Sequence, residues 1–88
     1  MILGPVGNQL KDKLSASLHP TYLEIIDESN QHHGHAGAHP SGESHFRVRI
    51  ASDAFRGLSR VAQHRLVNAA VAEELKSRVH ALAVEVVD

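Results

Sequence analysis

The sequence predicts an α+β domain with the element order α-β-β-α-β. Residues 21–27 and 44–51 alternate apolar and polar side chains, which is typical of half-buried strands. Residues 59–77 are rich in alanine, leucine and valine at helical spacing, and residues 79–87, which are rich in β-branched valine, follow them. Because a helix separates the last strand from the other two, this last strand can pair parallel to one of them. We therefore expect a mixed three-stranded sheet with both helices packed on one face.

The length and composition limit the functions that this chain can have. Its 88 residues are sufficient for a single domain, 1–88, with one modest core. The absence of cysteine excludes disulfides and thiolate ligands, so a metal must be held by imidazole or carboxylate. One tyrosine and two phenylalanines disfavour a surface that binds single strands by base stacking. No apolar run approaches the ~20 residues that span a bilayer, and no signal peptide is recognisable. These features predict a cytoplasmic protein without a membrane partner.

The first helix is predicted from a leucine stripe. Leu10, Leu14 and Leu18 recur at four-residue steps, so they share one helical face. Asn8 is a suitable N-cap residue, and Pro20 ends the segment.

The first two strands each have one apolar face. Because side chains alternate along a strand, one set is expected to face the helices and the other to face away. The expected inward residues are Leu23, Ile25, Phe46, Val48 and Ile50, and the outward ones include Tyr22, Glu24, Ile26, His45, Arg47 and Arg49.

Residues 59–77 are predicted to form one helix, with Ser59 as its N-cap and with Glu73 and Glu74 at its more hydrophilic end. Adjacent residues on a helix point about 100 degrees apart, so these two glutamates cannot form a facing acid/base pair. The sequence also lacks a nucleophile elbow and a phosphate-binding loop. We therefore expect a protein that is not an enzyme.

Histidines are concentrated in the predicted loop 30–43, which is rich in glycine and separates the first two strands. His32, His33, His35 and His39 lie in it. Imidazole is the commonest protein ligand for transition metals, but a flexible loop with several histidines also binds metals adventitiously. Spacing alone leaves both interpretations open.

The other histidines have two interpretations each. His80 falls in the last predicted strand, where it is either a core histidine that donates to a backbone carbonyl or a metal ligand. His45 is interpreted as a register or turn residue. His64 and Arg65 are either an exposed pair on the second helix or part of a functional surface.

Taken together, these segments resemble the BolA family. The resemblance is carried by LEIIDES at 23–29, GESHFRV at 42–48, FRGL at 55–58, QHRLV at 63–67, AEEL at 72–75 and VHAL at 79–82. It covers nearly the whole chain and keeps the order of every motif. It implies a fold similar to class II KH domains, in agreement with the periodicities.

The resemblance also implies a partner and a cofactor. Members of the family form a heterodimer with a monothiol glutaredoxin and share a [2Fe-2S] cluster that glutathione also ligates. Carried over to this chain, the ligand near the C-terminus is His80, and the second ligand lies in the histidine loop, where His35 is favoured and His32 comes next. The isolated protein is then expected to lack the cluster. Since imidazole must be neutral to bind iron, cluster binding is expected to weaken on acidification.

The alternative function implied by the family is DNA-binding transcriptional regulation. It would use Arg56, Arg60, His64 and Arg65 on and before the second helix, with Arg47 and Arg49 on the open sheet face. The formal net charge of −1 provides less attraction to phosphate than the basic surface of a dedicated DNA-binding protein.

Overall fold

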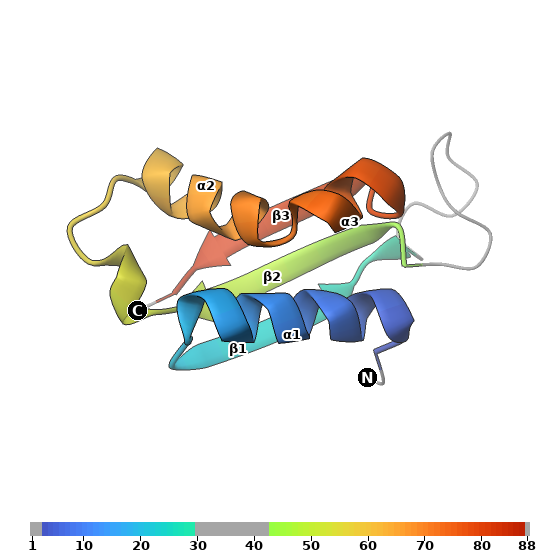
Figure 1. Cartoon of the computed structure of the whole chain (residues 1–88), viewed down its shortest axis with the longest axis horizontal. Coiled ribbons are helices and arrows are strands. Elements are labelled where there is room, and N and C mark those ends of the chain that lie inside the picture. Colours follow the sequence, from blue (N-terminus) through green and yellow to red (C-terminus); the bar gives the residue numbers. More distant parts are fainter. Residues whose placement is uncertain (1–2, 30–42, 88) are drawn as a thin grey trace.

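The computed structural model describes residues 3–29 and 43–87 of the chain (Figure 1). The described elements are α1 (Pro5–Leu18), β1 (Tyr22–Asp27), β2 (His45–Ala51), the short 3-10 helix η2 (Asp53–Phe55), α2 (Arg60–Ala70), α3 (Ala72–Ser77) and β3 (Ala81–Val86). None of the helices in this described part is long and apolar enough to cross a bilayer.

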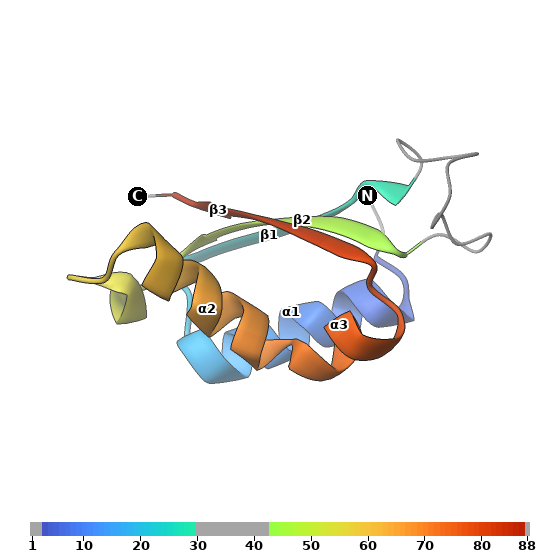
Figure 2. The ribbon, with the colours of Figure 1, turned by 90° about the horizontal axis from the view of Figure 1, so that it is seen from above.

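The strands of the described residues form a three-stranded sheet in the order β1-β2-β3. β1 pairs antiparallel with β2, with Ile25 opposite Val48. β2 pairs parallel with β3, with Val48 opposite Val84. Figure 2 shows α1, α2 and α3 on one side of the sheet, with the other side open. The predicted mixed sheet and the one-sided packing of the helices are therefore confirmed.

The core lies between the helices and the covered face of the sheet. Its strand side chains are the predicted inward ones. They pack against leucines of α1, against Val67 of α2 and against Val71, which follows α2. Burying each such side chain stabilises the fold by about 1.5–3 kcal/mol relative to exposure. The fully buried residues include Leu10, Leu14, Phe46, Val48, Ile50, Val67 and Val71.

The first helix begins earlier than predicted. Its N-cap is Gly4 and Pro5 occupies the first turn, where the missing proline N–H leaves no hydrogen bond unmade. The N–H of Gly7 donates to Oε2 of Glu43 at 2.8 Å, so a carboxylate 36 residues away caps this helix. Asn8 lies inside the helix, and the prediction that it caps the helix was wrong.

The predicted helix 59–77 is two helices, separated at Val71. Ser59 caps α2 as predicted, since its hydroxyl accepts from the N–H of Ala62. Val71 has φ −119° and ψ 29°, outside the helical range, and its side chain is fully buried. No glycine or proline marks the break, and Val71 belongs to the hydrophobic core cluster.

Glu74 also differs from its predicted exposed position. It is 4% exposed, and its Oε2 lies 2.7 Å from Nζ of Lys13 on α1. The hydrogen bond with Glu74 raises the pKa of Lys13. An uncompensated carboxylate at this depth would be costly, so this ion pair is what permits Glu74 to be buried.

Candidate functional site

His80 lies in the connection between α3 and β3, one residue before the strand begins. Its side chain is exposed, so the interpretation as a core histidine was wrong. The backbone, in contrast, is fixed, because the His80 N–H donates to the carbonyl oxygen of Ser44 at 2.7 Å. The ring therefore faces solvent from a position that the sheet determines.

Ser44 connects this position to the end of β1. It is fully buried, and its N–H donates to Oγ of Ser29 at 2.9 Å. The Ser44 carbonyl accepts from Ala81 at 3.3 Å as well as from His80. Residues from three separate parts of the chain thus meet at one end of the sheet, the end at which β2 and β3 begin (Figure 1).

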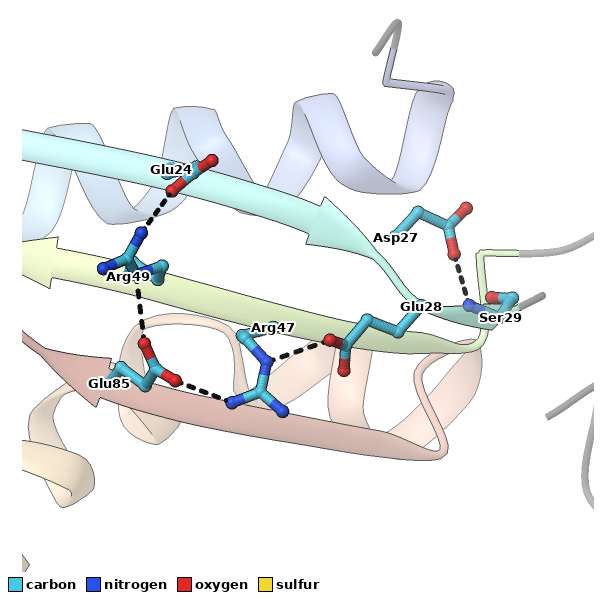
Figure 3. A network of polar contacts seen from close by, with 7 residues as sticks. All are labelled: Glu24, Asp27, Glu28, Ser29, Arg47, Arg49 and Glu85. Carbon is cyan, nitrogen blue, oxygen red and sulfur yellow. Dashed lines mark hydrogen bonds and ion pairs between the residues drawn. The ribbon is translucent and has the colours of Figure 1, made fainter. Parts of the chain in front are cut away.

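Asp27 holds the two residues that flank segment 30–42. Its Oδ1 accepts from the N–H of Ser29 at 2.9 Å, as Figure 3 shows, and its Oδ2 accepts from the N–H of Glu43 at 3.3 Å. The segment therefore starts and ends beside the connection that carries His80. We call Asp27, Ser29, Glu43, Ser44, His45 and His80 the His80 edge.

His32, His33, His35 and His39 lie outside the described residues. The predictions that His35 or His32 is the second ligand stay predictions.

His45 is the functional candidate that sequence reasoning did not select. Its Nδ1 lies 2.9 Å from Oγ of Ser44, and its ring centroid lies 6.2 Å from that of His80, with 19° between the ring planes. No local pattern identifies this pair, because residues 45 and 80 meet only through the parallel pairing of β2 with β3.

The two histidines do not complete a metal site by themselves. Among residues 3–29 and 43–87, no group of three or more histidine, aspartate or glutamate side chains is arranged to hold a metal ion. A metal at the His80 edge therefore requires further ligands from elsewhere.

The arginines on the open face of the sheet are paired with glutamates (Figure 3). Arg47 contacts Glu28 and Glu85, each at 2.9 Å, and Arg49 contacts Glu24 at 3.2 Å and Glu85 at 3.0 Å. The hydrogen bond with Glu28 raises the pKa of Arg47, and that with Glu24 raises the pKa of Arg49. These two guanidinium groups have carboxylate partners already.

The arginines on and before α2 are exposed: Arg56, Arg60 and Arg65, which we call the α2 arginine surface. Arg56 lies 3.5 Å from Asp53, and both side chains are exposed. His64 is only partly exposed. Its Nε2 is buried, with no hydrogen-bond partner in the part of the chain that the structure describes, so this nitrogen is not presented to a phosphate.

A pocket of about 280 Å³ lies apart from the His80 edge. Its lining residues come from the position before β1, the segment after β2, α2, the end of β3 and the residue after it. They are Thr21, Ser52, Asp53, Phe55, Arg56, Gln63, Val86 and Val87.

Comparison with known families gives a match over most of the chain. The sequence model of the BolA family, described as "BolA-like protein", matches residues 14–87. The chain belongs to the BolA family. The resemblance predicted from the motifs is therefore confirmed.

Relatives include proteins with and without a functional name. A Sinorhizobium protein described as an uncharacterized protein in the cobS 5' region is 53% identical over 77 residues, which is 86% of this chain and 83% of that protein. Human BolA-like protein 1 is 48% identical over 94% of this chain, which spans 58% of the human protein. A Vibrio cholerae protein named DNA-binding transcriptional regulator BolA is 44% identical over 90% of this chain and 71% of its own length.

A solved structure of the family matches the fold closely. The BolA domain of SufE1 from Arabidopsis thaliana aligns with a TM-score of 0.87 and 45% identity, covering 97% of this chain and 93% of that one. The α+β architecture predicted from the sequence is therefore the architecture of this family.

Proposed function

We propose that this protein is a partner of a monothiol glutaredoxin and supplies histidine ligands to a shared [2Fe-2S] cluster. Its role would be in assembly or trafficking of iron-sulfur clusters, or in regulation linked to iron, and we expect it to act in the cytoplasm without catalysing a reaction. The observation that carries the proposal is the exposed His80 ring, held beside the two anchors of the histidine-containing segment.

The donor set at the His80 edge fits such a cluster. Neutral imidazole binds iron, and Rieske centres use two histidines on one iron of a [2Fe-2S] cluster. When bound, the cluster would supply a redox-active centre with a potential raised by the imidazoles. The described residues hold too few ligands for a metal of their own, which favours a centre completed by a partner's thiolates.

The residues of this chain have distinct parts in the proposal. His80 would bind iron, and the Ser44 carbonyl fixes where its backbone lies. Asp27 holds Ser29 and Glu43, the residues on either side of segment 30–42. His35 or His32 would thereby be tethered close to His80. A short tether raises the effective concentration of the second ligand.

The decisive experiment is co-expression with a monothiol glutaredoxin, followed by iron and sulfide quantification of the purified complex. We expect a cluster-bearing heterodimer from the wild-type chain and its loss in His80→Ala. His19→Ala is the matched control, because His19 is an exposed histidine at the C-terminal end of α1. A cluster that is retained in the His80→Ala complex, with an unchanged visible CD spectrum, would refute the proposal.

The same complex identifies the second ligand. We expect His35→Ala to lower the iron content, and His32→Ala to leave it near that of the wild type. The reverse result would assign the loop ligand to His32 instead.

The second candidate function is DNA-binding regulation, favoured by the name of the Vibrio relative. It would use Arg56, Arg60 and Arg65 as phosphate contacts, because these side chains are exposed, whereas Arg47 and Arg49 each contact two glutamates. A sequence-discriminating mobility shift with purified apo protein, weakened by salt, would support this function. A chromophore that depends on glutaredoxin would support the first.

A further inference from the structure

Ser44 and His45 surround the backbone of His80 in a way that the proposed function does not require. Ser44 is fully buried at the end of the sheet, where its carbonyl receives the N–H of His80 and that of Ala81. Its hydroxyl bonds to the His45 ring, so one residue fixes both the His80 backbone and the neighbouring imidazole.

The two rings are stacked, with planes that differ by only 19° and centroids 6.2 Å apart. This separation is within the range of about 4.5–7 Å at which flat rings interact favourably. An imidazole binds a metal through a lone pair in the plane of the ring. Because the two stacked planes are nearly parallel, the in-plane lone pairs of the two rings do not converge on one metal ion. This favours a positioning role for His45 beside the His80 ring.

We propose that Ser44 and His45 are positioning residues, which determine the direction in which His80 presents its ring to iron. This inference rests on the proposed function. The hydroxyl of Ser44 orients His45, and the His45 ring limits the rotation of the His80 ring. Such outer contacts orient metal ligands generally, and their loss typically reduces metal affinity or activity by about 10–100-fold.

The first test uses the apo protein, so it does not depend on a cluster. Nitrogen-15 NMR of the histidine rings reports which ring nitrogen carries the proton. We expect Ser44→Ala to shift the His45 and His80 ring signals, because the bond to Nδ1 is lost while the backbone carbonyl remains. Ser77→Ala is the matched control, since Ser77 is an exposed serine that bonds only within α3 in the described residues.

The second test uses the complex with holo monothiol glutaredoxin. His45→Phe keeps a flat ring without the nitrogen, and His45→Ala removes both. We expect both complexes to retain iron and sulfide but to show a shifted visible CD spectrum and cluster potential, with the larger shift in His45→Ala. A purely structural role for His45 would change thermal stability without moving the spectrum of the assembled cluster.

The outcomes separate this inference from the proposed function. Loss of the cluster in His80→Ala together with unshifted spectra in both His45 variants and Ser44→Ala overturns the positioning role alone. Loss of the cluster in His45→Phe to the same extent as in His80→Ala also overturns it, because His45 would then be a ligand. An unaffected cluster in His80→Ala refutes the proposed function itself. Far-UV CD of each apo variant verifies that it is folded.

Discussion

The His80 edge and the arginine-bearing surfaces differ in how their side chains are held. At the His80 edge, the Asp27 carboxylate, the Ser29 hydroxyl and the Ser44 carbonyl accept backbone N–H groups and so fix the backbone, while the His80 ring remains exposed. On the open sheet face the opposite holds, because the charged ends of Arg47 and Arg49 are fixed by glutamates. A fixed backbone with an exposed donor suits metal ligation, whereas guanidinium groups held between two carboxylates are less available to phosphate. The comparison favours the His80 edge over the arginine-bearing surfaces as the binding site.

The largest expected loss of stability is that of Asp27→Ala at the His80 edge, with Asp53→Ala beside the α2 arginine surface as the comparison. Asp27→Ala removes the acceptor for the N–H groups of Ser29 and Glu43, and we expect it to lower the free energy of unfolding by about 2 kcal/mol. Asp53→Ala removes only an exposed ion pair with Arg56, so a loss of about 0.5 kcal/mol or less is expected. Urea denaturation measures both.

The same two variants distinguish the surfaces functionally. Asp27→Ala should also weaken the spectral response to holo glutaredoxin, while Asp53→Ala should leave it unchanged. Equal responses from the two variants would show that the anchors of segment 30–42 have no part in the complex.

A second prediction compares the two helix caps. Glu43 caps α1 from a distant part of the chain, and Ser59 caps α2 locally. We expect Glu43→Ala and Ser59→Ala each to cost about 1 kcal/mol of stability, because each removes one acceptor from a helix N-terminus. Only Glu43→Ala should alter complex formation with glutaredoxin, since Glu43 borders segment 30–42. Thermal unfolding and titration with holo glutaredoxin check both expectations.

These two caps also illustrate what the sequence reveals about the fold. Ser59 was predicted because serine before an apolar helical pattern is a local signal. Glu43 was not, because its contact with Gly7 depends on how α1 packs across the sheet. The strand pattern was likewise readable from alternation, whereas the break at the buried Val71 has no glycine or proline as a local marker.

The candidate site shows the same division. The motif resemblance selected His80, but its place before β3 and its exposure came only from the structure. Ser44 and His45 were missed because they approach residue 80 through long-range strand pairing. The buried Nε2 of His64 and the buried Glu74 were also unforeseen, since a helical wheel does not reveal which polar side chains the neighbouring elements cover.

A third prediction concerns the α2 arginine surface. We expect Arg60→Ala combined with Arg65→Ala to leave the glutaredoxin response unchanged, because both side chains are exposed and outside the His80 edge. If apo protein binds DNA through them, the slope of log affinity against log salt should decrease by about 0.9 per lost contact. Fluorescence anisotropy at several salt concentrations measures the slope. A lost cluster response would contradict the separation of the two surfaces.

The smallest expected effect tests whether the arginines of the open face are paired in solution. The hydroxyl of Tyr22 donates to Oε1 of Glu24, the oxygen that also contacts Arg49. This hydrogen bond raises the pKa of Tyr22 above its ordinary value of 10.0. Since folding favours the protonated phenol, the associated stability is present below pH 10.0 and is lost as the pH rises through the raised pKa.

Tyr22 is the only tyrosine and the chain has no tryptophan, so ultraviolet absorbance of tyrosinate reports this one group. We expect a titration midpoint above 10.0 in the wild type and a lower one in Glu24→Ala. Glu28→Ala is the matched control, because Glu28 pairs with Arg47 on the same face. An unchanged midpoint in Glu24→Ala would mean that the Glu24 cluster is not formed in solution. Arg49 would then keep only its contact with Glu85, and the evidence that the open-face arginines are paired would be weaker.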